Sequence, residues 1–171
     1  MEIAKRIYNV AHITGEFKLR SGNISNEYFD KYLFEAEPEL LVDIIKIMKP
    51  LIPLKTEILA GLEMGGIPVV TALSILSGIK SAFIRKKAKE YGTCKLSEGA
   101  DVKDKYVCVI EDVVTTGGQI IESVRELRKL GANIDTVLCV ILRNDKAIEI
   151  LANEGLKIIP AFTMDYIKEH A

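Results

Sequence analysis

The chain reads VCVIEDVVTTGGQI over residues 107–120, and this stretch decides its fold. Its apolar, β-branched first half is typical of a buried strand, which ends in the acidic pair Glu111 and Asp112. A turn rich in threonine and glycine follows and leads into a predicted helix at 119–130. Ligands of open α/β sheets bind at the carboxyl ends of strands, and the free N–H groups at a helix start attract anions. The stretch therefore predicts an anion cradle beside two hydroxyl acceptors, which suits a sugar phosphate.

The rest of the chain alternates between short apolar runs and longer helical patterns. Units of these lengths predict an α/β fold with a mostly parallel sheet and helices on both faces, in a single domain over 1–171. The expected helices are 2–12, 38–48, 67–77, 119–130, 146–153 and 164–169, and the expected strands are 17–19, 28–34, 57–60, 81–84, 106–110, 136–142 and 156–160.

The 171 residues carry a formal net charge of -1, with 49% hydrophobic and 27% charged residues. This balance is that of an ordinary globular protein and gives no overall basic field for nucleic acid. The first residues have no apolar signal core, and no segment approaches membrane-spanning length. The three cysteines lack metal-site spacing and are read as free thiols of a reducing compartment. We therefore expect a cytoplasmic protein with no metal-binding cluster and no nucleic-acid or membrane partner.

Residues 86–104 interrupt the alternation with a long, strongly charged segment between two predicted strands. Loops of this length without an apolar face are usually functional or disordered. The first half of the segment is rich in lysine and follows directly on Arg85, as a lid that closes over a polyanion would be. The alternative is a solvated surface hairpin.

A second glycine-rich turn, GLEMGG at 61–66, also follows a predicted strand and precedes a helix. A tight turn from strand to helix needs glycine in any case, so this turn alone is weak evidence for a ligand. Two such turns on neighbouring parallel strands would face one crevice. The pair predicts a shared site.

At this point the chain resembles the type I phosphoribosyltransferases, and among them the orotate phosphoribosyltransferases. The acidic pair followed by TTGG is similar to the family's signature for phosphoribosyl diphosphate. Three further segments stand in the family's order and spacing: FKLRSG at 17–22 with Ser25 and YFD at 28–30, FIRKKAKEYG at 83–92, and VILR at 140–143. The resemblance implies transfer of ribose 5-phosphate from phosphoribosyl diphosphate to orotate, with Mg²⁺, in pyrimidine synthesis. It also implies a small hood built from about residues 1–35.

The resemblance assigns a role to each residue of the sugar-phosphate side. Glu111 and Asp112 would hold the ribose hydroxyls while the anomeric carbon becomes oxocarbenium-like. Cations on a flexible catalytic loop over about 86–104 would stabilise the leaving diphosphate. Lys89, Arg85 and Asp112 are the expected catalytic residues. The expected contacts to phosphoribosyl diphosphate are Arg85, Lys86, Lys89, Glu111, Asp112, Val113, Val114, Thr115, Thr116, Gly117, Gly118 and Gln119.

The same resemblance places the base and a partner subunit. Arg143, at the end of a strand, would pair with the carboxylate of orotate, because arginine favours two-pronged contacts to carboxylates. Thr115 and Arg20 would also contact orotate. The family's loop commonly reaches into a neighbouring subunit, which implies a homodimer with shared loop residues. Without the resemblance, Arg143 is equally a surface arginine beside Asp145.

The chain departs from the family pattern on the diphosphate side. Tyr91 stands where the loop often has a histidine, Met64 and Gly65 stand where a lysine often lies, and Arg20 replaces a lysine. These departures leave two alternatives to an orotate enzyme. One is a non-catalytic sensor that binds the same ligand, and the other is a phosphoribosyltransferase for another base.

Overall fold

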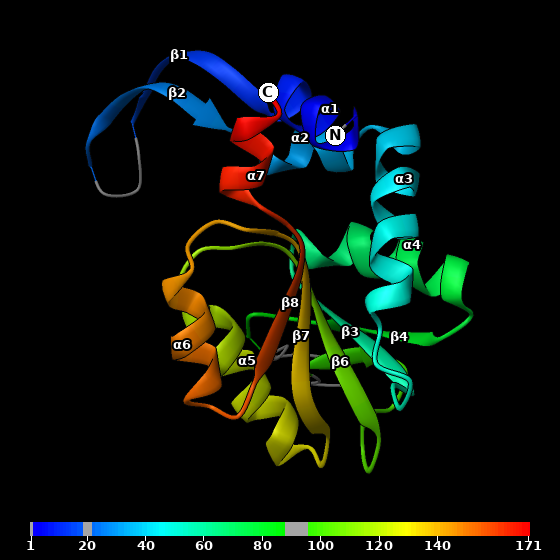
Figure 1. Cartoon of the computed structure of the whole chain (residues 1–171). Coiled ribbons are helices and arrows are strands. Elements are labelled where there is room, and N and C mark those ends of the chain that lie inside the picture. The colour runs from blue at the N-terminus through cyan, green and yellow to red at the C-terminus, as the bar shows by residue number, and fades with distance from the viewer. Residues whose placement is uncertain (1, 19–21, 88–95) are drawn as a thin grey trace.

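The computed structural model describes residues 2–18, 22–87 and 96–171. Its centre is a six-stranded sheet of order β5-β4-β3-β6-β7-β8 (Figure 1). All neighbouring strands run parallel except β5, which pairs antiparallel with β4 at one edge. The predicted fold class is confirmed. The strands are β3 (Ile58–Leu62), β4 (Lys80–Ile84), β5 (Ser97–Gly99), β6 (Tyr106–Val114), β7 (Asn133–Leu142) and β8 (Lys157–Thr163).

Helices cover both faces of this sheet (Figure 1). On one side lie α3 (Pro38–Met48), continued by a 3-10 turn (Lys49–Leu51), and α4 (Gly66–Ser77). On the other side lie α5 (Gly118–Lys129) and α6 (Lys146–Ala152). Each face has its own hydrophobic cluster, because alternate residues of a strand point to opposite faces. Cys108 of β6 and Cys139 of β7 are buried free thiols on the two faces.

The order of the strands contains a switch point between β3 and β6. The chain leaves β3 through α4 toward β4, whereas it leaves β6 through α5 toward β7, on the opposite side. Loops that leave two neighbouring strands in opposite directions open a crevice at the carboxyl ends, where ligands of such sheets bind. Both glycine-rich turns follow these two strands, as the sequence predicts.

β6 runs four residues further than predicted, to Val114, and so includes the acidic pair. The extension is held by pairing with β7, where Val113 lies opposite Ile141 and Val114 opposite Leu142. β7 itself is buried over most of its length, so this pairing continues to the end of the strand.

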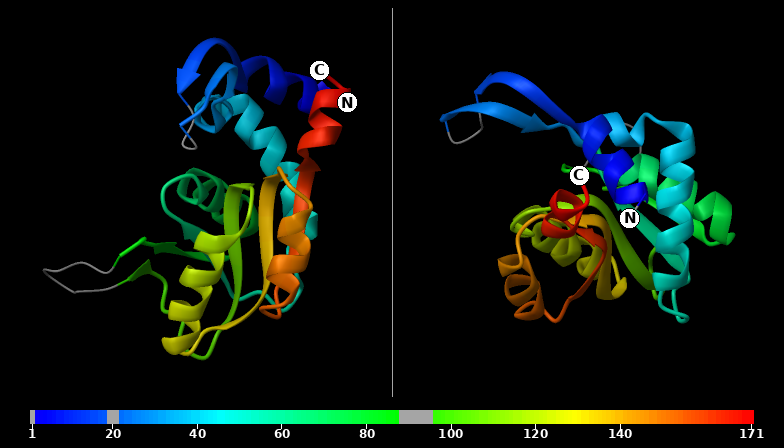
Figure 2. Two further views of the ribbon diagram at one scale, coloured as in Figure 1. Left: turned by 90° about the vertical axis from the view of Figure 1, so that its left-hand side faces the viewer. Right: turned by 45° about the horizontal axis from the view of Figure 1, so that its top comes forward.

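A hood stands over the carboxyl ends of the strands (Figure 2). It contains α1 (Glu2–Ala11), β1 (His12–Lys18), β2 (Ile24–Phe29) and α2 (Lys31–Glu35), as the resemblance implies, and also the last helix, α7 (Met164–Glu169). Ile7 and Phe34 of the hood and Ile167 of α7 share the hydrophobic cluster of the α3 and α4 face. The hood and the sheet therefore pack into one continuous core.

The predicted strand at 28–34 is wrong beyond Phe29. Asp30 caps a short helix there, because its side chain accepts a hydrogen bond of 3.1 Å from the N–H of Tyr32. Aspartate favours such a cap over an extended strand. The correction matters because α2 turns Lys31 and Glu35 toward the sheet.

The loop predicted over about 86–104 is shorter in its second half. β5 forms a hairpin with β4, in which Ser97 lies opposite Ile84, and Val102 is buried against the sheet. Hairpin pairing depends on backbone hydrogen bonds, so the charged sequence did not reveal it. In the described ranges, no helix is both long and apolar enough to cross a membrane.

Candidate active site

The two glycine-rich turns meet at the switch point. The side-chain amide of Gln119, at the start of α5, donates a hydrogen bond of 3.4 Å to the carbonyl oxygen of Glu63. The N–H of Glu63 donates to the carbonyl of Ile84 at 2.9 Å, and the carboxylate of Glu63 accepts from the N–H of Lys86. One turn thus touches both the phosphate loop and the base of the charged loop.

The phosphate loop, defined here as Thr115–Gln119, is open to solvent at its key positions. Thr115, Thr116, Gly118 and Gln119 are exposed, and the side of Gly117 is closed by Leu151. Gly117 has φ +78°, a conformation that favours glycine, and α5 begins directly after it without a side-chain cap. The first four N–H groups of a helix have no partner within the helix. The N–H of Ile121 donates to the carbonyl of Gly117 at 3.0 Å, which leaves the N–H groups before it at the exposed start of α5.

Asp112 is completely buried and points to the hood face of the sheet. Its Oδ2 lies 2.6 Å from the Nζ atom of Lys31, and its Oδ1 accepts the N–H of Val113 at 2.6 Å. A Cβ atom at Gly65 would collide with this carboxylate, so glycine is what makes room for it. Burial alone would raise the pKa of Asp112, but Lys31 and Glu35 outweigh it and lower that pKa.

Glu111 points to the opposite face and is partly exposed. Its carboxylate accepts the N–H of Asp112 at 3.2 Å. Burial, followed by the neighbouring charge of Asp112, raises the pKa of Glu111 to about 8. The acidic pair is therefore split: one carboxylate is half-accessible at the crevice and the other is covered by the hood.

Glu35 completes a buried cluster that sequence reasoning missed. The side chain is 8% exposed, and neither carboxylate oxygen has a hydrogen-bond donor among the described residues. It lies within hydrogen-bonding reach of Asp112, and burial followed by this contact raises the pKa of Glu35 to about 9. We call Lys31, Glu35 and Asp112 the hood cluster. Asp30, a residue that favours helix caps, was the signal: a helix begun there places Lys31 and Glu35 on one face.

Two cavities contain the other predicted residues. A large one of about 1210 Å³ is lined by Arg85, Lys86, Gly118 and Gln119, and continues along α5. Arg143 lines a separate cavity of about 270 Å³, shared with Asp165 of α7. The N–H of Arg143 donates to the carbonyl of Val114 at 2.8 Å, so the arginine is nonetheless adjacent to the phosphate loop.

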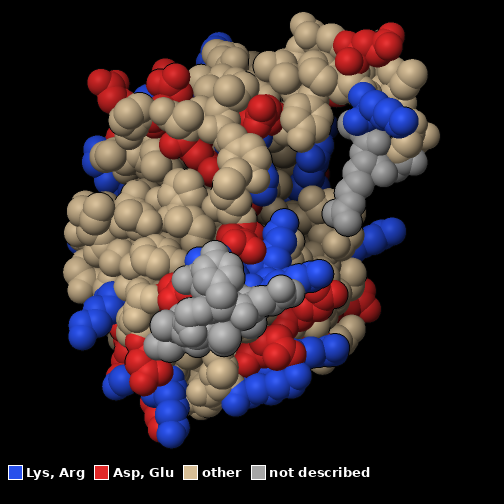
Figure 3. Space-filling model, turned by 180° about the vertical axis from the view of Figure 1, so that it is seen from behind, with Lys and Arg blue, Asp and Glu red and all other residues tan. Residues whose placement is uncertain are grey.

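The structure describes some of the cationic side chains predicted for the charged loop. Arg85 lies at the end of β4, where its Nε atom is 3.5 Å from a carboxylate oxygen of Glu98 on β5. In the face shown in Figure 3, Lys and Arg side chains gather below the hood with acidic groups among them. Lys89 and Tyr91 of the loop, and Arg20 of the hood, lie outside the described residues.

No group of three or more potential metal ligands occurs among the residues that the structure describes. Mg²⁺ is commonly held by substrate phosphates and water with few protein ligands.

Comparison with known proteins identifies the family. Residues 34–167 match the phosphoribosyl transferase domain model. The chain is 49% identical over 161 residues to an orotate phosphoribosyltransferase from Nocardioides sp. (strain ATCC BAA-499 / JS614), a match that covers 94% of this chain and 90% of that one.

Two solved structures of the orotate phosphoribosyltransferase of Mycobacterium tuberculosis H37Rv are also similar. One, in complex with Fe(III) dicitrate, has a TM-score of 0.88 at 27% identity and covers 97% of both chains. The other, in complex with 5-phospho-alpha-D-ribosyl 1-diphosphate, has a TM-score of 0.83 at 25% identity and covers 98% of this chain and 97% of that one. With the family model and the close sequence relative, this likeness settles the family: the chain belongs to the orotate phosphoribosyltransferases, within the phosphoribosyltransferase family.

Proposed function

We propose that this chain transfers the ribose 5-phosphate group of phosphoribosyl diphosphate to N1 of orotate, a step of pyrimidine synthesis. The new bond joins N1 to the anomeric carbon, and the bond from that carbon to the diphosphate oxygen breaks with its electron pair leaving on diphosphate. The proton of N1 is released to the leaving diphosphate or to water. The observation that carries the proposal is the open start of α5 directly after an acidic pair, at the switch point of the sheet.

The phosphate loop fits the 5′-phosphate. Exposed backbone around Gly118 brings N–H groups close to a ligand, and the hydroxyl groups of Thr115 and Thr116 add donors. Val113 and Val114 end the strand and hold the start of the loop. Glu111 is the carboxylate that is partly exposed at the crevice, whereas Asp112 is buried and paired with Lys31.

The developing charge of the leaving diphosphate calls for cations. Arg85 and Lys86 line the large cavity beside Gln119, and Lys89 follows them in the sequence. Cations already in place before the bond breaks lower the barrier, because they need no reorganisation at that moment. A bound Mg²⁺ ion would neutralise part of the same charge.

The orotate side rests on fewer contacts. Arg143 is exposed beside Val114 and is free to turn its guanidinium toward a planar carboxylate. Thr115 and Arg20 are the other proposed contacts. We further propose a cytoplasmic homodimer in which loop residues are shared between subunits, and no nucleic-acid or membrane partner.

A direct assay tests the reaction. Purified protein, orotate, phosphoribosyl diphosphate and Mg²⁺ are mixed, and the loss of orotate absorbance is followed. Turnover is the expected result. Binding of phosphoribosyl diphosphate by calorimetry without any turnover would instead identify a sensor, and turnover with another base alone would refute the choice of orotate.

The substitution Arg143→Ala tests the base contact. We expect the KM for orotate to rise by roughly 30-fold or more, since a charge-assisted contact worth about 2 kcal/mol is lost. Affinity for phosphoribosyl diphosphate is expected to stay within threefold of the unchanged chain. The matched control is Arg6→Ala, on α1, where the arginine pairs with Asp43 of α3 away from both cavities. Equal effects of the two substitutions would remove Arg143 from the orotate site.

A further inference from the structure

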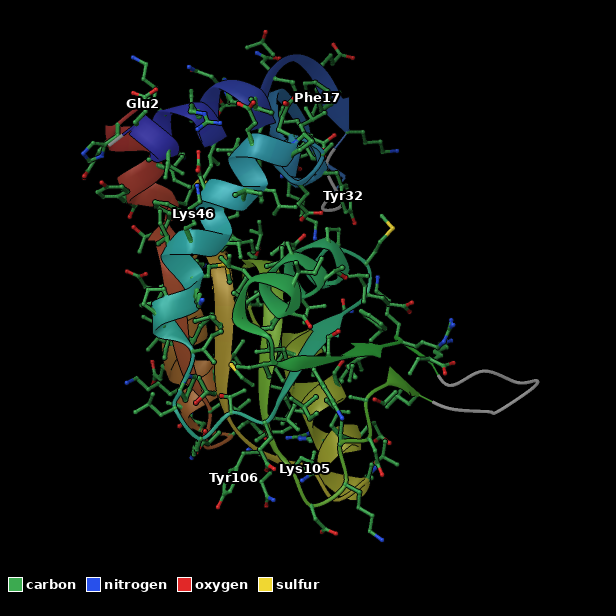
Figure 4. The ribbon with its side chains drawn as sticks, turned by 90° about the vertical axis from the view of Figure 1, so that its right-hand side faces the viewer. Glu2, Phe17, Tyr32, Lys46, Lys105 and Tyr106 are labelled. Atoms are coloured by element: carbon green, nitrogen blue, oxygen red, sulfur yellow. The ribbon has the colours of Figure 1, made fainter. Side chains whose placement is uncertain are left out.

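The hood cluster joins the hood to the strand that carries the acidic pair. Lys31 and Glu35 are four residues apart on α2, so both project from one face of this helix toward β6. Asp112 rises from β6 to meet them and is 0% exposed. Figure 4 shows Tyr32, the neighbour of Lys31, on the side of the hood that faces the sheet.

The charges of this cluster do not balance if every group is ionised. Two carboxyl groups, Glu35 and Asp112, face one ammonium group, that of Lys31, which lies 2.6 Å from Asp112. Glu111, on the same strand as Asp112, adds a further negative charge when it ionises. An unpaired carboxylate in a buried position is costly, so one of the two carboxyl groups keeps a proton.

The surroundings decide which carboxyl group holds the proton. Asp112 has the ammonium group and the N–H of Val113 as partners, and both favour its charged form. The oxygens of Glu35 have no donor among the described residues, and the neighbour within reach is an acceptor. A proton on Glu35 supplies the missing donor, and the two carboxyl groups then make a hydrogen bond instead of repelling one another.

We propose that Glu35 is a positioning residue of the transfer reaction, which in its neutral form donates a hydrogen bond to Asp112 and, with Lys31, fixes that carboxylate and the hood over the ribose site. The proposal rests on the proposed function, because Asp112 matters to catalysis only if a ribose binds beside β6. Glu35 contacts no substrate in this arrangement. It acts through Asp112.

If Glu35 must be neutral, activity should fall at alkaline pH. Burial and the charge of Asp112 raise the pKa of Glu35 to about 9, so its proton is lost above that pH and a second negative charge enters the cluster. The groups that act on Glu35 are Lys31 of its own helix and Asp112 and Glu111 of β6. Ionisation is therefore expected to push Asp112 from its place.

Two substitutions of Glu35 distinguish its role as a hydrogen-bond donor from the effect of its size. Glu35→Gln keeps the shape and an N–H donor but cannot ionise, whereas Glu35→Met keeps the size and loses the donor. Glu39→Met, at an exposed position in the first turn of α3, controls for the loss of a carboxylate near the hood. Each variant is assayed for kcat/KM with phosphoribosyl diphosphate from pH 6 to pH 10, and for binding of this ligand by calorimetry.

At pH 7.5 we expect Glu35→Met to lower kcat/KM at least tenfold, because a hydrogen bond to a charged group is lost. Glu35→Gln should restore kcat/KM to within about threefold of the unchanged chain. Above pH 9 the unchanged chain is expected to lose activity that Glu35→Gln retains. Glu111 is present in both proteins, so an alkaline loss that comes from Glu111 alone would appear in both. Equal activity of Glu35→Met and Glu39→Met, or the same alkaline loss in Glu35→Gln, would overturn the proposal.

Thermal unfolding gives a test that does not need turnover. The unfolded chain ionises Glu35 near its ordinary pKa of 4.5, whereas the folded chain keeps the proton up to about pH 9. The contribution of Glu35 to stability is therefore complete below pH 4.5 and is lost progressively as the pH rises toward 9. Glu35→Gln should match the unchanged chain near pH 4.5 and exceed its Tm by a growing margin up to pH 9. A margin that does not change with pH would refute the protonated Glu35.

These readouts also distinguish two kinds of failure. If the unchanged chain shows no turnover with orotate, the proposed reaction fails, while calorimetric binding and the pH dependence of Tm still test Glu35. If Glu35→Met does not fold, the comparison of Glu35→Gln with the unchanged chain decides the matter.

Discussion

The two glycine-rich turns at the switch point look alike in sequence and serve different ends. In the turn after β3, glycines allow close packing: a Cβ atom at Gly66 would lie 2.5 Å from the carbonyl oxygen of Ile110, and one at Gly61 would collide with Val70. In the turn after β6, a Cβ atom at Gly118 would meet no atom within 4 Å of the described structure. The first turn holds a helix against the sheet, and the second leaves backbone bare for a ligand.

Gly66→Ala places a methyl group in the turn after β3 and should have the largest effect on stability. Its methyl group meets backbone, which cannot give way as a side chain would, so we expect a loss of about 3 kcal/mol in the free energy of unfolding. Urea denaturation followed by circular dichroism measures it. A loss below about 1 kcal/mol would mean that this glycine is not needed for packing.

Gly117→Ala lies between the two cases. The residue has φ +78°, which alanine adopts only with strain, and its Cβ atom would lie 3.0 Å from a methyl group of Leu151, a flexible side chain. We expect a loss of about 1–2 kcal/mol in the free energy of unfolding, again by urea denaturation. Gly117→Asn is the control, because asparagine tolerates this conformation better and should lose less. Equal losses would point to crowding rather than backbone strain.

Gly118→Ala should show the smallest change in stability and of the opposite sign. Alanine is favoured over glycine within a helix, so unfolding should become harder by up to about 0.5–1 kcal/mol. The same methyl group would stand in the phosphate loop, and calorimetry should show roughly tenfold weaker binding of phosphoribosyl diphosphate if about 1.4 kcal/mol of contact is lost. Unchanged affinity would place the phosphate elsewhere.

The central sheet could be predicted from the sequence because its signals are local. The apolar runs at β3, β6 and β7 are long enough to show their pattern, and the helices between them show theirs. Gly131 and Gly155, with φ +90° and +69°, follow α5 and α6 in the left-handed conformation that is common just after a helix. The acidic pair and the phosphate loop lie within one short stretch of sequence, so their closeness in space could be predicted without knowing the fold.

The missing parts depend on contacts between distant segments or on backbone alone. α2 has five residues, too few for a helical period to show, and its cap was visible only as a single aspartate. β5 has three residues and pairs through its backbone. The burial of Asp112 under Lys31 could not be predicted from the sequence around either residue, because no local pattern indicates that α2 packs against β6.

The opening and closing helices of the described chain meet in the hood, and this has a consequence for the order of folding. α1 packs near α7, with Ala4 and Ile7 in the same cluster as Ile167. Contacts between segments so far apart in the chain carry a large loop-closure cost and form late. The sheet with its phosphate loop can therefore take shape while the hood is still open. In a protein caught at that stage, Glu35 and Asp112 would both lie in water and ionise, and Glu35 would gain its proton only when α2 closes over β6.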